Sequence, residues 1–163
     1  MLTPQALLAR LDAAGIAHRT VEHPPVFTVE EAKALRGTLP GAHIKNLFLR
    51  NKKEEMWLVV ALEDRAIDLK GLGERLGAGR LSFGSPDRLA RYLGVTPGSV
   101  TPLALLNDAA GAVRLAMDRG LADADPVNAH PLINSMTTAL AMRDLLRLLE
   151  DTGHRPVWLD LDR

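Results

Sequence analysis

Two apolar runs joined by a short polar connection constrain the fold of this chain more than any other feature. The first run, residues 47–49, is Leu-Phe-Leu and leads into Arg50, and the second, residues 56–62, is apolar throughout. The connection at residues 51–54 carries only polar side chains. Two such runs separated by a polar turn predict a β-hairpin, with its strands in the core of the protein.

The residues before the hairpin place a cation and an amide where the first strand begins. Gly41 follows Pro40 and predicts a turn, and Lys45 and Asn46 stand side by side before the apolar run. A lysine beside a buried strand cannot lose its charge cheaply, so its ammonium group must reach water, a carboxylate or an anionic ligand. For a lone lysine, a solvent-facing head group is the simpler interpretation. Two segments further along the chain favour the ligand.

The rest of the chain alternates between helix and strand patterns. Thr3 and Pro4 are typical of a helix N-cap and first position, and leucines follow at helical spacing up to Gly15. Further helices are predicted over residues 29–35, 67–76, 86–92 and 137–150, and further strands over residues 16–21, 80–83, 112–117 and 157–161. Residues 103–107 fit either type, and residues 120–126 predict a loop. The pattern predicts one α+β domain over residues 1–163, built on a mixed, largely antiparallel sheet.

Composition argues against several classes of function. The 20 basic and 20 acidic residues give zero net charge, which argues against bulk coating of nucleic acid but leaves room for a local basic patch. The chain has no cysteine, so it has no disulfide, no thiolate nucleophile and no cysteine-based zinc site. Neither metal-binding histidine spacing nor a nucleotide-binding fingerprint occurs, so no metal and no cofactor are expected. The sequence shows neither a signal-peptide pattern nor an apolar run long enough to span a membrane. We therefore expect a cytoplasmic location and no membrane partner.

The first of the two further segments is a loop rich in glycine and proline over residues 94–102. Its inner part has the pattern G-x-x-x-P, formed by Gly98, Ser99, Val100, Thr101 and Pro102. Glycine lets a backbone approach a ligand closely, and a rigid loop can direct its N–H groups at a carbonyl or an oxyanion. A plain connection between a helix and a strand fits the same residues, because loops of this composition are common.

The second segment places His130 directly before a proline, within the sequence Asn-Ala-His-Pro at residues 128–131. A residue before proline is biased towards an extended backbone, which limits where its side chain points. Such a histidine could bind a substrate, donate a proton near neutral pH or only support a loop. A lone histidine is more often structural, so the functional interpretation depends on the three segments occurring together.

Together, these segments make the sequence similar to the YbaK/ProX family of aminoacyl-tRNA deacylases, whose relatives include the editing domain of bacterial prolyl-tRNA synthetases. The resemblance runs from His-Pro-Pro at residues 23–25 through residues 45–49 and 94–102 to residues 125–128. Each motif is weak alone, but their order and spacing make the resemblance strong. It implies a mixed, largely antiparallel sheet or partial barrel surrounded by helices. The free-standing branch that removes alanine from mischarged proline tRNA is the most similar, and the His-Pro pair favours it.

The resemblance also implies roles for individual residues. Lys45 is expected to hold the terminal nucleotide or a phosphate of the tRNA, while Asn46 and His130 line the aminoacyl pocket. These three are the candidate catalytic residues. Residues 98–102 are expected to present backbone groups to the aminoacyl ester. Arg50 and Arg80, together with Lys45, are expected to contact the tRNA.

The expected reaction is hydrolysis of the aminoacyl ester of a mischarged tRNA, with alanine on proline tRNA as the expected ester. The partners implied are the acceptor stem and 3′ end of that tRNA and, transiently, prolyl-tRNA synthetase. An aminoacyl ester is already activated, so a site need only orient it, stabilise the oxyanion and admit water or the neighbouring 2′-hydroxyl. Two alternatives stay open: the same reaction on cysteine or serine, and a non-catalytic module that binds aminoacyl-tRNA.

Overall fold

A computed structural model describes residues 1–25 and 29–162 of the chain. Its strands are β1 (His18–Glu22), β2 (Ala42–Arg50), β3 (Met56–Leu62), β4 (Ser82–Phe83), β5 (Val113–Asp118), β6 (Val127–Ala129), β7 (Met136–Leu140) and β8 (Val157–Leu159). Its α-helices are α1 (Pro4–Ala13), α2 (Val29–Thr38), α3 (Leu69–Leu76), α4 (Pro86–Leu93) and α5 (Met142–Asp151). Three short 3₁₀ helices, η1 (Pro97–Ser99), η2 (Pro102–Asn107) and η3 (Arg119–Leu121), complete the described elements.

The strands form one mixed sheet in the order β1-β7-β6-β2-β3-β5-β8, with β4 paired to β2 beside this path. The pairs β2/β3, β2/β4, β1/β7 and β6/β7 are antiparallel, and the pairs β2/β6, β3/β5 and β5/β8 are parallel. The expected α+β class and mixed sheet are therefore confirmed, and so is the expected hairpin, which is β2 and β3. None of the described helices has the length and apolar character needed to span a bilayer.

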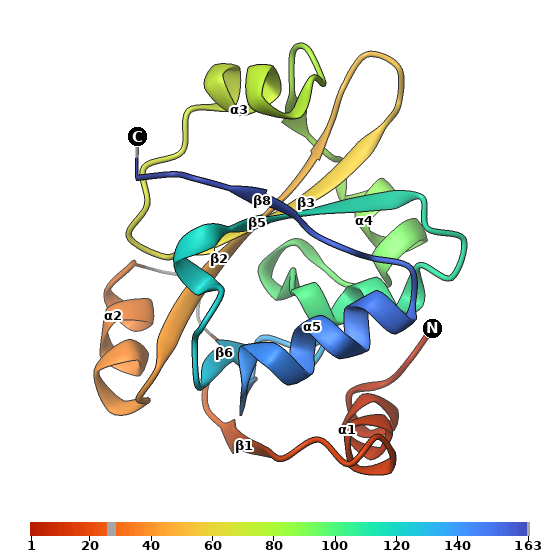
Figure 1. Ribbon diagram of the computed structural model, residues 1–163. Coiled ribbons are helices and arrows are strands. Elements are labelled where there is room, and N and C mark those ends of the chain that lie inside the picture. The colour runs from red at the N-terminus through yellow and green to blue at the C-terminus, as the bar shows by residue number, and fades with distance from the viewer. Residues whose placement is uncertain (26–28, 163) are drawn as a thin grey trace.

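The hairpin divides the core into two parts because alternate side chains of a strand point to opposite faces. Phe48 and Val60 belong to the larger cluster, which includes residues of α1, α4, η2 and α5. Leu49 and Val59 belong to a smaller cluster, which includes Leu72 of α3. Figure 1 shows α3 at the top of the view, with α5 and α1 below strands β3 and β5. Strand β2 therefore has a buried layer on each face.

Thr3 caps the first helix as expected, and two further helices have cap residues of the usual types. The hydroxyl of Thr3 accepts a hydrogen bond from the N–H of Ala6, and the hydroxyl of Ser85 accepts one from the N–H of Arg88. Helix α3 ends at Gly77, whose φ of 64° lies in the left-handed region that glycine adopts at little cost. Local sequence therefore sets these boundaries.

The prediction of one helix over residues 137–150 is wrong in its first part. Residues up to Leu140 form strand β7, and the helix begins only at Met142. Thr137 and Thr138 are β-branched and favour a strand, and β7 lies between β1 and β6, so tertiary pairing adds to that preference. The hydroxyls of Thr20 and Thr138 also form a hydrogen bond of 2.8 Å across the β1/β7 pair.

Two smaller differences concern short elements. Strand β6 was not predicted, because three residues are too few to show a strand period. The apolar run at residues 103–107, which fitted either type, lies in η2, and the predicted loop at residues 120–126 overlaps the end of η3. Neither change alters the fold class.

Candidate functional site

Gly41 allows β2 to begin against the residues that lead into β6. Its φ is 99°, and an added Cβ would lie 2.4 Å from the carbonyl oxygen of Pro126, closer than any ordinary contact. The N–H of Ala42 donates to that same carbonyl at 2.9 Å. A glycine is therefore needed here for two reasons, its backbone conformation and the close approach of another chain segment.

The parallel register of β2 and β6 brings Lys45 and His130 to corresponding places. Ala42 lies opposite Val127 and His43 lies opposite Asn128. Lys45 lies two residues after His43, and His130 lies two residues after Asn128. Continuing the same register therefore places Lys45 and His130 beside each other. The sequence separates them widely, but the β2/β6 register places Lys45, within β2, level with His130, just past the end of β6.

Lys45 carries a charge that no carboxylate neutralises in the described part of the chain. Its ammonium group donates a hydrogen bond to the main-chain carbonyl of Arg65, and it has no other partner there. A carbonyl is neutral and uses one of the three ammonium donors. Two donors and the whole positive charge are therefore left for an anionic or polar ligand.

Asn46 faces the other side of the sheet from Lys45. It lies opposite Val60, which belongs to the larger core cluster, whereas Lys45 lies opposite Ala61. The side-chain oxygen Oδ1 of Asn46 is buried and has no hydrogen-bond partner among the described residues. Such an unpaired acceptor costs about 1–3 kcal/mol, so a donor brought by a ligand would recover much of that cost.

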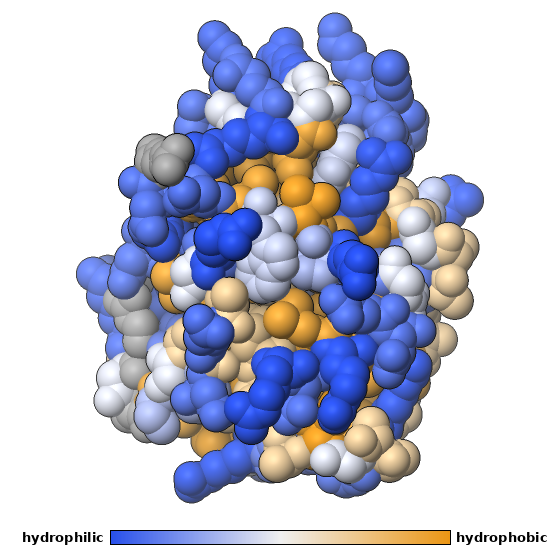
Figure 2. All heavy atoms as spheres, viewed as in Figure 1, coloured by the Kyte–Doolittle hydropathy of each residue, from blue (hydrophilic) through white to orange (hydrophobic). Residues whose placement is uncertain are grey.

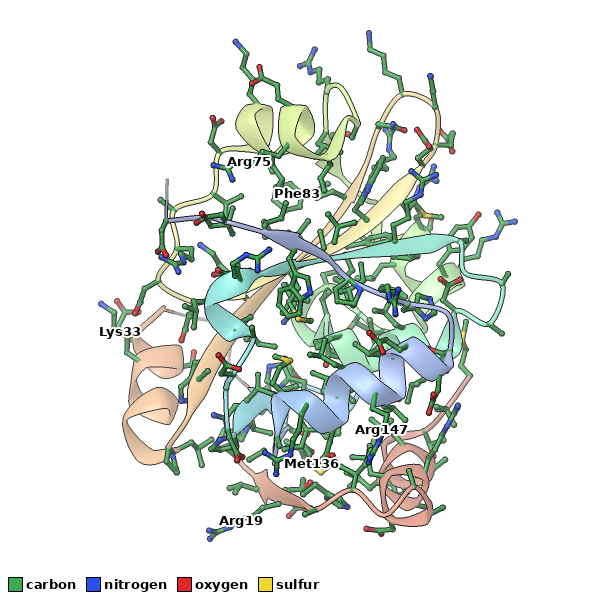
Figure 3. The ribbon with its side chains drawn as sticks, in the orientation of Figure 1. Arg19, Lys33, Arg75, Phe83, Met136 and Arg147 are labelled. Atoms are coloured by element: carbon green, nitrogen blue, oxygen red, sulfur yellow. The ribbon has the colours of Figure 1, made fainter. Side chains whose placement is uncertain are left out.

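His130 is held as a neutral ring with one nitrogen available. Its Nδ1 lies 2.8 Å from the carbonyl oxygen of Met136, and since a carbonyl only accepts, Nδ1 carries the proton. Burial lowers the pKa of His130, the bond to Met136 opposes that change, and the nearby charge of His23 adds to the lowering. Nε2 is therefore an unprotonated acceptor at neutral pH. Met136 is labelled in Figure 3, at the start of β7.

His23 is a second histidine at this site, and its side chain was not among the predicted site residues. Its ring centroid lies 6.3 Å from that of His130. Nδ1 lies 2.8 Å from the carbonyl oxygen of Pro24, so it carries a proton, and Nε2 lies 2.8 Å from the hydroxyl of Thr137. The His-Pro-Pro pattern at residues 23–25 was the available signal. The sequence alone could not show that the ring of His23 lies near that of His130.

The loop at residues 98–102 is anchored at its C-terminal end. Thr101 is fully buried, and its hydroxyl accepts from the N–H of Leu103 at 3.3 Å, which caps η2. Ser99 is also buried, whereas Gly98 is exposed. Val100 packs on the larger core cluster, the cluster on the face of β2 that carries Asn46. The loop is thus fixed on one side of the sheet and presents its glycine to solvent.

Arg50 and Arg80 lie near each other and far from Lys45. Arg50 ends β2 and pairs with Ser82 of β4, and Arg80 precedes Ser82 by two residues. A strand rises about 3.4 Å per residue, so five residues of β2 place Arg50 about 17 Å from Lys45. Arg80 is exposed and has no ion-pair partner among the described residues. Figure 2 shows hydrophilic side chains gathered at this upper end of the molecule.

Arg65 and Asp118 were also missed from the sequence. Arg65 follows β3 in the polar segment Glu-Asp-Arg, and Asp118 ends β5 as a carboxylate after an apolar run. Only the fold shows that the carbonyl of Arg65 meets Lys45 and that the side chain of Arg65 pairs with Asp118. Among the described residues, no group of three or more metal-ligating side chains gathers into a metal site.

Comparisons with known proteins show the family of this chain. A family model described as an aminoacyl-tRNA editing domain matches residues 23–148. The prolyl-tRNA editing protein ProX of Acetoanaerobium sticklandii is 40% identical over 151 residues, which cover 92% of each chain. The prolyl-tRNA synthetase associated domain-containing protein 1 of Bos taurus is 41% identical over 163 residues, 97% of this chain and 95% of that protein.

Solved structures share the fold at lower identity. A crystal structure of a candidate trans-editing enzyme for prolyl tRNA synthetase matches with a TM-score of 0.69 and 22% identity, over 98% of this chain and 99% of that chain. A second crystal structure, of the hypothetical protein APE2540, has a TM-score of 0.70 at 22% identity over 92% of this chain and 95% of that chain. The chain therefore belongs to the aminoacyl-tRNA editing domain family and is an aminoacyl-tRNA deacylase.

Proposed function

We propose that this protein, acting in trans with residues 1–163 as one editing domain, removes alanine from proline tRNA mischarged with alanine. The observation that carries the proposal is the 40% identity, over 92% of both chains, to a protein named for prolyl-tRNA editing. Alanine is smaller than proline, so a pocket that admits alanine and excludes proline acts as a second size filter. Editing of this kind is needed when binding alone discriminates too little between amino acids.

The charge on Lys45 supports a role in holding the 3′ end of the tRNA. Its ammonium group has two free donors and no carboxylate partner in the described part of the chain. A phosphate or the terminal ribose supplies the acceptors that this group lacks. Holding that end of the substrate fixes the ester in the pocket, and such positioning can supply a large part of the rate enhancement.

Asn46 and His130 offer acceptors to the reacting end of the substrate. The buried Oδ1 of Asn46 suits a donor such as the α-ammonium group of the aminoacyl ester. The unprotonated Nε2 of His130 suits a hydroxyl or the attacking water. In the loop at residues 98–102, backbone N–H groups that precede Pro102, which itself has none, would stabilise the oxyanion. The reaction needs no protein nucleophile, because the ester is already activated.

Arg50 and Arg80 would contact the acceptor stem, about 17 Å along β2 from the residue that holds the 3′ end. Arginine suits this task because its planar group binds phosphate through two donors. The tRNA is thus gripped at two separated places. We place the reaction in the cytoplasm, with prolyl-tRNA synthetase as a transient partner that supplies the mischarged tRNA.

A deacylation panel tests the proposal. Proline tRNA charged with alanine, proline, cysteine or serine is incubated with the protein, and release of each amino acid is timed against the spontaneous rate. Fast release of alanine with prolyl-tRNA spared supports the proposal. Comparable hydrolysis of prolyl-tRNA, or preference for cysteine or serine, contradicts the proposed specificity. Binding of the tRNA without release of any amino acid would indicate a non-catalytic module.

A further inference from the structure

The group that holds the Lys45 ammonium is itself held by a buried carboxylate. Lys45 donates to the carbonyl of Arg65, which lies in the turn directly after β3. This turn is closed by a hydrogen bond of 3.0 Å from the N–H of Arg65 to the carbonyl of Leu62. The position of the ammonium group therefore depends on how firmly residues 62–65 are fixed.

Asp118 fixes both ends of that turn. Its side chain has no exposed surface, and its Oδ2 accepts from the N–H of Leu62 at 3.1 Å and from Nε of Arg65 at 3.0 Å. Its Oδ1 accepts from the N–H of Gly120 at 2.9 Å. Burial alone would raise the pKa of Asp118, but the N–H groups of Gly120 and Leu62 and the Arg65 guanidinium together lower it. The carboxylate thus stays ionised and keeps all three bonds.

Neighbouring residues also hold the Arg65 guanidinium and keep the turn close to β5. The Arg65 guanidinium also pairs with Asp162, so it is held from a second side. An added Cβ at Gly120 would lie 2.8 Å from Nη2 of Arg65 and 2.9 Å from Cδ1 of Leu62. Glycine at this position lets β5 and the turn approach closely enough for Asp118 to reach both ends.

We propose that Asp118 and Arg65 are positioning residues for Lys45, a role that rests on the proposed function of that lysine. The buried carboxylate holds the turn, the turn presents the Arg65 carbonyl, and the carbonyl fixes the ammonium group at the end of a flexible four-carbon chain. Neither residue contacts the substrate. Loss of either one leaves Lys45 charged but poorly placed, and positioning errors of this kind lower rates substantially.

The main test is Asp118→Asn, with Asp108→Asn as the matched control. Asp108 is a second buried aspartate, which caps η2 and accepts from the N–H groups of Ala112 and Val113, where β5 begins. Both variants should lower the melting temperature. Only Asp118→Asn should also lower kcat for alanyl-tRNA hydrolysis, by about tenfold. Arg65→Gln, a change at a partly exposed side chain, is the milder second variant should Asp118→Asn fail to fold.

A double-mutant cycle that combines Asp118→Asn with Lys45→Ala shows whether Asp118 acts through Lys45 or only stabilises the fold. Binding of a non-hydrolysable amide analogue of the alanyl-tRNA 3′ end gives a readout in variants without activity. Asp118→Asn should weaken binding severalfold in the wild-type background and hardly at all beside Lys45→Ala. Equal weakening in both backgrounds, or a loss of kcat equal to that of Asp108→Asn, would overturn the inference. Unchanged hydrolysis and binding in Lys45→Ala alone would overturn the proposed role of Lys45, and this inference with it.

Discussion

Two buried aspartates hold the two ends of strand β5, and they have nearly the same hydrogen bonds: Asp118 is its last residue, and Asp108, which caps η2, bonds the N–H of its first residue, Val113. Asp108 accepts from two main-chain N–H groups and from Nε2 of His154 at 3.0 Å. Asp118 accepts from two main-chain N–H groups and from Nε of Arg65 at 3.0 Å. The difference lies in what comes next. His154 contacts the hydroxyl of Thr152, which donates to a helix carbonyl, whereas the backbone of Arg65 receives Lys45.

The comparison shows that the same hydrogen-bonding arrangement around a buried aspartate can stabilise the fold in one place and position a site residue in another. The Asp108 network is closed, because His154 is almost completely buried and its partners are all part of the fold. The Asp118 network is open at one end, because the ammonium group that it steadies keeps two unused donors. We expect changes at the first network to alter stability alone, and changes at the second to alter activity as well.

The largest expected effect is on stability, at the closed network. His154→Ala removes the partner of a buried carboxylate and leaves a cavity, so unfolding should become easier by about 3 kcal/mol. Thermal or urea unfolding measures this change, and deacylation assayed well below the melting temperature should be unaffected. Asp12→Ala is the control, because it breaks a histidine–aspartate pair at the surface and should cost under about 1 kcal/mol. Reduced kcat in folded His154→Ala would break the distinction between the two networks.

The next effect is on activity, at the open network. Lys45→Ala removes a charge-assisted contact of about 1.5–3 kcal/mol, so the deacylation rate should fall about tenfold to a hundredfold or more. Its melting temperature should hardly change, since the ammonium group loses one hydrogen bond to a carbonyl. Lys45→Arg keeps the charge but alters shape and reach, and should restore activity only in part. Lys52→Ala, at an exposed lysine, is the control. A destabilised but fully active Lys45→Ala would contradict this.

Two strands, β3 and β7, show which features can be predicted from sequence. Strand β3 was predicted with its observed limits, because a continuous apolar run bounded by polar residues has few alternatives. Residues 137–140 were assigned to a helix, because their strand pairing with β1 and β6 is set by distant residues. Local patterns thus predicted most elements, whereas long-range pairing overrode the local helix pattern at residues 137–140.

At the candidate site, too, contacts between residues far apart in the sequence could not be predicted. Lys45, Asn46 and His130 were singled out from their local segments, the resemblance implied their roles, and those roles remain predictions. The fold adds that Lys45 and His130 lie level across β2 and β6 and that Asn46 faces the opposite side of the sheet. Arg65 and Asp118 could not be predicted, since 53 residues separate the two and no local pattern links a strand-ending aspartate to a turn after another strand.

A smaller effect is expected at His130, the open counterpart of His154. His130 is held through Nδ1 alone, and we propose that its unprotonated Nε2 accepts a hydrogen bond from the substrate. His130→Ala should therefore lower the rate by less than the factor of about a hundred typical for loss of a general acid or base. Selectivity should relax, with hydrolysis of prolyl-tRNA rising relative to alanyl-tRNA. A variant inactive at every pH but with normal tRNA binding would make His130 an acid or base.

The smallest expected effect is a dependence of stability on pH that belongs to His130. Burial lowers the pKa of His130 in the folded protein from its ordinary value of 6.5, and the nearby His23 lowers it further. The unfolded chain therefore binds a proton more readily than the folded chain, so folding stability rises with pH in this range. The contribution is complete above pH 6.5 and is lost as the pH falls through the lowered pKa.

Unfolding free energies of the wild type and His130→Ala, measured from pH 8 to pH 5, test this sign. Their difference should be constant at the upper end and should change in favour of the variant at the lower end. One proton limits the slope to about 1.4 kcal/mol per pH unit. A difference that grows in favour of the wild type as the pH falls would mean that the folded protein binds the proton more tightly. His130 would then be charged at the site, and its Nε2 would donate to the substrate instead of accepting.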